Sequence, residues 1–130
     1  ILEIENKLYF FQRETEESET LSLYPTQFGK VSGSPIIKDI GKIITNYADI
    51  LYYLDGHNKI KSYDLKANVS NKVDKRAFDR DSMVLNSKNR KVYLLSVSDF
   101  STSGGELVEL DLASGMVRQI AENVAALLNV

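Results

Sequence analysis

Hydrophobic and polar positions alternate in short stretches along the chain, and this pattern predicts strands rather than helices. The alternation is clearest in residues 59–63 and 106–112, and the other apolar stretches are rich in β-branched residues, leucine and tyrosine. These residue types suit a pleated, half-buried surface. A helical period is a possible alternative only in residues 121–128. The chain is therefore expected to be all-β.

The strand patterns occur three times. An aliphatic residue precedes a tyrosine at Tyr9, Tyr52 and Tyr93, with steps of 43 and 41 residues between these tyrosines. We divide the chain into three modules of four strands, at residues 1–40, 41–80 and 81–121, within one β domain, followed by a tail at 122–130. The expected strands are 1–5, 7–12, 19–24 and 35–40, then 42–47, 49–54, 59–65 and 69–73, then 82–86, 91–97, 106–112 and 116–120.

The turn chemistry repeats with the strands. In the third module the third strand ends with Asp111-Leu112-Ala113-Ser114-Gly115. The second module has Asp64-Leu65 at the same place, with Asn68 near the position of the glycine. The first module lacks this pattern and has Tyr24-Pro25 instead. This pattern resembles the blade repeat of bacterial β-propellers of the YVTN, TolB-like and quinoprotein-like type. The resemblance covers nearly the whole chain. It implies three four-stranded antiparallel propeller-like blades and no particular reaction.

Three blades are fewer than the four to eight that close a propeller. We favour part of a larger propeller whose remaining blades lie elsewhere in a longer chain or on another chain. The first residue is Ile1 rather than methionine, which fits a piece of something larger. The alternatives are a homodimer that shares six blades, and an open arc capped by residues 121–130.

The composition and net charge exclude some classes of binding partner. The net charge is −2, and this balance argues against nucleic acid and anionic membranes, which require a concentrated positive field. The longest apolar runs, 50–54 and 124–128, are far shorter than the roughly 18 residues of a membrane span, so no membrane insertion is expected. The chain has no cysteine, which excludes disulfides and thiolate sites. The resemblance to exported bacterial propellers favours a periplasmic or secreted location.

Catalytic chemistry is not indicated. His57 is the only histidine and lies in an expected hairpin tip, so it can supply neither a catalytic triad nor a zinc site. Asp74, Asp79 and Asp81 are close in sequence but lack the spacing of a calcium loop. We therefore expect no catalytic residue, no metal and no cofactor, and predict that the protein is not an enzyme.

Charge is sorted between the two ends of the expected blades. The hairpins between second and third strands and the connections between modules share one rim, and the other turns share the opposite rim. Basic residues at the opposite rim are Lys30, Lys66, Lys88, Arg90 and Lys91. The candidate binding residues of the first rim are Glu14, Glu16, Glu17, Glu19, Asp55, Asp79, Asp81 and Asp99, with Asp39 beside them and the aromatic Phe100 in a glycine-rich loop.

The acidic rim indicates a non-catalytic binding or scaffold domain with a protein or peptide partner that is basic. Two other functions stay open. The chain could be the propeller part of a larger enzyme, either quinoprotein-like or gating a hydrolase. It could also be a carbohydrate-binding propeller, for which only Phe100 and Phe78 offer aromatic platforms. The recurring tyrosines are expected to pack between blades rather than to bind a ligand.

Overall fold

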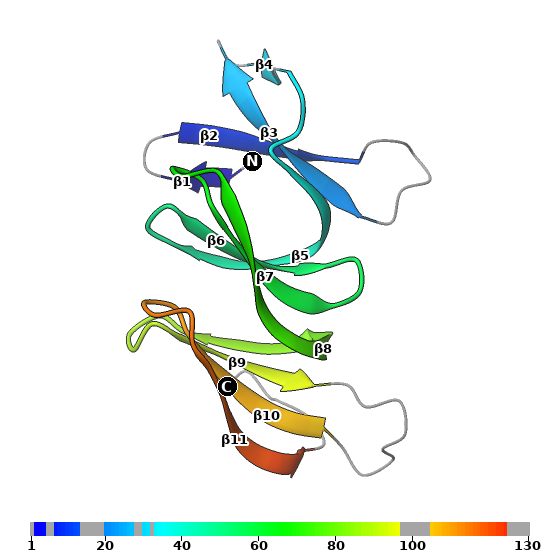
Figure 1. The fold of residues 1–130 in the computed structure, drawn as a ribbon, viewed down its shortest axis with the longest axis vertical. Helices are drawn as coiled ribbons and strands as arrows, with labels where there is room; N and C mark the ends of the chain where they lie inside the picture. Colours follow the sequence, from blue (N-terminus) through cyan, green and yellow to red (C-terminus); the bar gives the residue numbers. More distant parts are fainter. Residues whose placement is uncertain are drawn as a thin grey trace. The chain divides into compact units, whose positions relative to one another are not determined.

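The computed structural model describes residues 2–4, 7–13, 20–27, 30–31, 33–96 and 105–124. Every regular element in this part of the chain is a β-strand (Figure 1). The all-β prediction is therefore confirmed. The strands are β1 (Leu2–Ile4), β2 (Lys7–Gln12), β3 (Leu21–Gln27), β4 (Lys30–Val31), β5 (Ile37–Tyr47), β6 (Ile50–Asp55), β7 (Lys59–Asp64), β8 (Val69–Asn86), β9 (Lys91–Ser96), β10 (Gly105–Asp111) and β11 (Val117–Val124).

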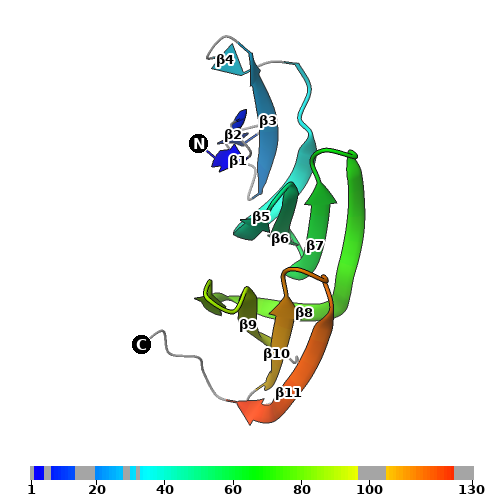
Figure 2. The same cartoon turned by 90° about the vertical axis from the view of Figure 1, so that its left-hand side faces the viewer.

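Strands that follow one another in the chain are hydrogen-bonded neighbours, in the order β1-β2-β3-β5-β6-β7-β8-β9-β10-β11, with β4 paired to β3. The pairings for which a register is defined are antiparallel. Short turns make this order possible, because antiparallel neighbours need only a hairpin between them. The result is a continuous β-meander, in which successive hairpins are visible in two views (Figures 1 and 2).

The chain forms two compact units. Unit 1 contains residues 1–57 and 61–71, and unit 2 contains residues 58–60 and 72–130. The first two modules therefore lie mainly in unit 1 and the third in unit 2. Strands β7 and β8 carry residues of both units.

Two strands run through the module boundaries that the sequence predicted. The expected strands 35–40 and 42–47 form one strand, β5, whose first half pairs with β3 and whose second half pairs with β6. The register shifts between Ile40 and Lys42, at the predicted boundary. Such a bulge re-aims a strand without ending it. One strand thereby serves as the last of one meander and the first of the next.

The long strand β8 corrects the prediction that residues 74–81 are a connection. They are extended, with a register shift between Phe78 and Met83. Asp74 Oδ1 accepts a hydrogen bond from the Arg76 N–H at 2.7 Å. This local hydrogen bond stabilises an irregular part of β8 whose backbone nevertheless remains extended. Strand β11 continues to Val124, so it extends beyond the expected strand end at residue 120 and residues 121–124 are not helical. Residues 125–130 lie outside the described part.

The core of unit 1 joins the first and second modules. Tyr9, Leu23 and Ile37 of the first module form one buried cluster with Leu51 and Tyr53 of β6. Alternation places Leu51 and Tyr53 on one face of β6, and Tyr52 on the other. Of the three recurring tyrosines that were expected to pack between blades, Tyr9 is the one in this cluster. Burial, together with the charges of Asp55 and Asp39, raises the pKa of Tyr53 to about 12.

The core of unit 2 comes from the centre of its meander. Val92 and Leu94 on β9 lie opposite Leu110 and Val108 on β10, and all four are at most 1% exposed. Since paired residues share a face of the sheet, these side chains form a single apolar patch.

Candidate binding site

A pocket of about 940 Å³ opens in unit 1. Its lining comes from the β1–β2 hairpin, β3, the approach to β5, and the turns that follow β5 and β7. All of these segments belong to unit 1. The lining residues are Ile4, Lys7, Leu8, Tyr9, Pro25, Ile36, Asp49, Leu65, Lys66 and Asn68.

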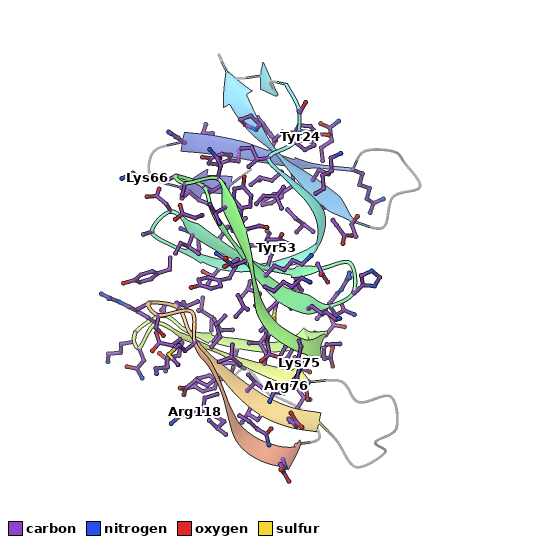
Figure 3. The ribbon with its side chains drawn as sticks, viewed as in Figure 1. Tyr24, Tyr53, Lys66, Lys75, Arg76 and Arg118 are labelled. Carbon is purple, nitrogen blue, oxygen red and sulfur yellow. The ribbon has the colours of Figure 1, made fainter. Side chains whose placement is uncertain are left out.

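The turn between β7 and β8 supplies one wall of the pocket. Asp64 Oδ1 accepts hydrogen bonds from the N–H groups of Lys66 at 2.9 Å and Ala67 at 3.0 Å. The Asn68 N–H donates to the Asp64 carbonyl at 2.8 Å, and Asn68 adopts a φ of 57°. Asparagine tolerates this left-handed conformation better than most residues. The turn therefore fixes the backbone of Lys66, a residue of the pocket lining that is labelled in Figure 3.

The hairpin between β5 and β6 supplies the neighbouring wall. Tyr47 pairs with Ile50, so the hairpin is closed by two residues, Ala48 and Asp49. Ala48 has a φ of 51°, as tight two-residue hairpins require. The Leu65 N–H donates to the Asp49 carbonyl at 2.9 Å and ties the two walls together.

The pocket combines an apolar wall with charges of both signs. Ile4 and Tyr9 are buried at 2% and 7% exposure, whereas Lys7 and Lys66 are exposed. Asp49 provides a carboxylate near Tyr9: burial raises the pKa of the Tyr9 hydroxyl, and the charge of Asp49 raises it further. A neutral phenol can donate a hydrogen bond but is a poor base, so this arrangement suits binding.

The structure describes only part of the predicted acidic rim. Glu14, Glu16, Glu17, Glu19, Asp99 and Phe100 lie outside the described residues. Asp55 belongs to unit 1, and its side chain is 4% exposed and 3.1 Å from Lys61 Nζ. Asp55 Oδ1 also accepts a hydrogen bond from the His57 N–H at 2.8 Å. The carboxylate of Asp55 therefore stabilises its hairpin and does not point to an open surface.

The other two rim residues lie together on β8 in unit 2. Asp79 is half-buried and accepts hydrogen bonds from the Asp81 N–H at 2.9 Å and the Ser82 hydroxyl at 3.1 Å. Asp81 is exposed. Of the described rim carboxylates named as candidate binding residues, only Asp81 presents an exposed side chain.

Unit 2 contains an ionic cluster that sequence reasoning missed. Lys91 Nζ lies 3.2 Å from Glu109 Oε1 and 3.4 Å from Asp111 Oδ2, and Arg118 Nη2 lies 3.2 Å from Glu109 Oε1. Burial acts to raise the pKa of Glu109, but its hydrogen bond to Lys91 and the charges of Lys91 and Arg118 lower it overall. Lys91 is thus neutralised and adds little to a basic rim. The signal was available in the alternation of Glu109 and Asp111 on one face.

The pocket residues were also missed as a group, although Lys66 was assigned to the basic rim. They come from five separate segments, and only the folding of unit 1 brings them together. The recurrence of Tyr9 was the one sequence signal for this region, and it indicated packing. Within the described ranges, no group of three histidine, cysteine or acidic side chains is placed to hold a metal ion. No helix in this part of the chain could span a membrane.

No family model, curated protein or solved structure matches the chain.

Proposed function

We propose that the protein is a non-catalytic binding module built from β-propeller-type blades, and that it binds a protein or peptide segment in the pocket of unit 1. The pocket itself carries this proposal. It is a concave site in which an apolar wall adjoins polar and charged groups, and concave sites of this kind are where ligands bind.

The repeat geometry supports the assignment of the modules as blades. The second and third modules share the same turn, since the Asn68 N–H bonds the Asp64 carbonyl at 2.8 Å and the Gly115 N–H bonds the Asp111 carbonyl at 2.7 Å. Consecutive strands are hydrogen-bonded neighbours, and in unit 1 residues of the first and second modules share one buried cluster. Blades of a propeller are four-stranded sheets with this connectivity.

The charges of the pocket favour an acidic segment that carries an apolar side chain. Lys7 and Lys66 place two positive charges at the lining against the single carboxylate of Asp49. An apolar side chain would contact Pro25 and Ile36, and a neighbouring carboxylate would reach the lysines. Charge complementarity of this kind selects partners and speeds their encounter.

The proposal is tested with two labelled probes, a short peptide of alternating leucine and glutamate and one of alternating leucine and lysine. Fluorescence anisotropy should show that the glutamate peptide binds, and that the double variant Lys7→Glu, Lys66→Glu weakens it by at least about tenfold. The matched control is Lys72→Glu, Lys88→Glu, which makes the same charge change at exposed lysines of unit 2 and should leave binding unchanged.

The acidic rim provides the competing site. If the lysine peptide binds instead, and replacement of Glu14, Glu16, Glu17 and Glu19 by alanine weakens it, the rim is the binding surface and the pocket proposal is wrong. Absence of binding by both probes would also count against the pocket.

A further inference from the structure

Equivalent positions in the three modules differ sharply in burial. The residue before each recurring tyrosine is Leu8, Leu51 or Val92, with 47%, 0% and 1% of its surface exposed. The residue after it is half-buried in the first module, at Phe10, whereas Tyr53 and Leu94 are 4% and 0% exposed. The first module therefore presents to solvent a face that is buried in the other two.

This exposed face has a defined composition. Alternation puts Leu8 and Phe10 on the same side of β2, and Tyr24 lies directly opposite Phe10 on β3. We name these three residues the Leu8 face. Tyr24 is half-buried (Figure 3). Two aromatic rings and a leucine on one sheet face form an apolar surface of the kind that marks an interaction site.

Unit 1 shows what covers such a face. The corresponding side chains of the second module, Leu51 and Tyr53, are buried by the opposite face of the first module, which contributes Tyr9, Leu23 and Ile37. The covering surface is thus the tyrosine-bearing side of another β-meander.

The third module carries a tyrosine-bearing face of this kind. Tyr93 on β9 pairs with Glu109 on β10, Glu109 pairs with Arg118 on β11, and Leu107 pairs with Leu95 one step along. We name Tyr93, Leu107 and Arg118 the Tyr93 face. Tyr93 and Leu107 are half-buried, and the Arg118 side chain is 71% exposed. Arg118 is labelled in Figure 3.

The two faces are chemically complementary. A guanidinium is attracted to the face of an aromatic ring, and the Leu8 face offers the rings of Phe10 and Tyr24. Glu109 Oε1 accepts a hydrogen bond from Arg118 Nη2, and this bond fixes the position of the guanidinium group. Apolar contact from Leu107 and Tyr93 would add to this attraction.

We infer that the Leu8 face docks the Tyr93 face of a second copy of this chain, in a head-to-tail contact that repeats the packing of the first module on the second. The contact is heterologous, so each copy uses one face to bind and offers the other.

Light scattering on a size-exclusion column tests this inference. The wild-type chain should have at least twice its monomer mass of 14.6 kDa at high concentration. Phe10→Glu places a charge on the Leu8 face, and Arg118→Glu reverses the charge on the Tyr93 face. Each variant alone should weaken self-association by at least about tenfold.

Mixing the two variants provides the decisive measurement. The Arg118→Glu chain keeps an intact Leu8 face and the Phe10→Glu chain keeps an intact Tyr93 face, so an equal mixture should recover a species of two chains. The matched control is Val69→Glu, because Val69 is a 48% exposed apolar residue of unit 1 that belongs to neither face. Its self-association should equal that of the wild type.

Three results would overturn the inference: a wild type that remains monomeric at every concentration, a mixture that fails to associate, or a Val69→Glu chain as weak as Phe10→Glu. If the wild type is monomeric, the partner of the Leu8 face would have to be a tyrosine-bearing β-meander from a different chain. Because Arg118 is highly exposed, its variant keeps the test valid even if Phe10→Glu fails to fold. Leu8 belongs both to the Leu8 face and to the pocket lining, whereas Phe10 and Arg118 do not line the pocket. Peptide binding is therefore also measured on the Phe10→Glu and Arg118→Glu chains, in which every pocket-lining residue is unchanged, so that the two proposals can fail separately.

Discussion

At the scale of single residues, space as well as backbone conformation determines where glycine is needed. Gly105 is buried at the start of β10, where a Cβ atom would overlap the carbonyl oxygen of Ser96 on the neighbouring strand. The Glu106 N–H donates to Ser96 Oγ at 2.8 Å, which holds the two strands together at this point. The absent side chain therefore permits the close approach of β9 and β10.

Gly105→Ala should lower the free energy of unfolding by about 3 kcal/mol, because the atom in conflict is backbone and the strands must separate. Urea denaturation measures the loss. Gly33→Ala is the comparison, since Gly33 has a φ of +66° but open space around its Cβ position. That change should cost only about 1 kcal/mol. Equal losses in the two variants would show that crowding at Gly105 is unimportant.

At the scale of elements, the turns after β7 and β10 are stabilised by the same set of local hydrogen bonds to an aspartate. Asp111 Oδ1 accepts bonds from the N–H groups of Ala113 at 3.0 Å and Ser114 at 3.3 Å, as Asp64 does in the other turn. Asn68 and Gly115 then take positive φ values of 57° and 74°. The sequence predicted this equivalence correctly, because the interactions span only a few residues.

Asn68→Val should destabilise the chain by about 1–2 kcal/mol, since a β-branched residue is strained in the left-handed region. Asn68→Gly should leave stability unchanged or slightly higher. Thermal unfolding followed by circular dichroism measures both. Ala67→Val is the control at an exposed neighbour with ordinary φ, and its effect should be small. A loss of similar size at Ala67 would mean that side-chain bulk, and not backbone conformation, is responsible.

The ends of the strands are the feature of the secondary structure that the sequence predicted least well. The sequence predicted a break between residues 40 and 42 and a connection at 74–81, but β5 and β8 continue through both. Pairing with strands on both sides keeps these segments extended, and that contribution depends on distant residues.

At the scale of the whole molecule, the dependence of stability on pH is expected to involve two carboxyl groups whose pKa values are lowered in the folded chain. Hydrogen bonds from the Ser114 and Ala113 N–H groups lower the pKa of Asp111, and Lys91 lowers it further. The pKa of Glu109 is also lowered. Both groups belong to unit 2. A carboxyl whose pKa is depressed on folding stabilises the native state above its unfolded pKa, and this contribution disappears as pH falls through the folded pKa.

Unit 2 should therefore lose stability as the pH falls below about 4, the ordinary range of these carboxyls. Hydrogen exchange at the buried amides of Leu94 and Leu110 monitors this unit. The double variant Glu109→Gln, Asp111→Asn should start less stable and show a flatter dependence on pH. An unchanged slope in the double variant would mean that other groups cause the acid response.

The sequence by itself determined the all-β character and the chemistry of the turns after β7 and β10, because these depend on alternation and on contacts a few residues apart. It also indicated that Tyr9 packs between modules. Only the tertiary structure decided that Asp55 is buried against Lys61, that Lys7, Asp49 and Lys66 line one pocket, and that Leu8 is exposed. These features join residues distant in the chain, and burial is a property of what packs on a surface, which no local pattern records.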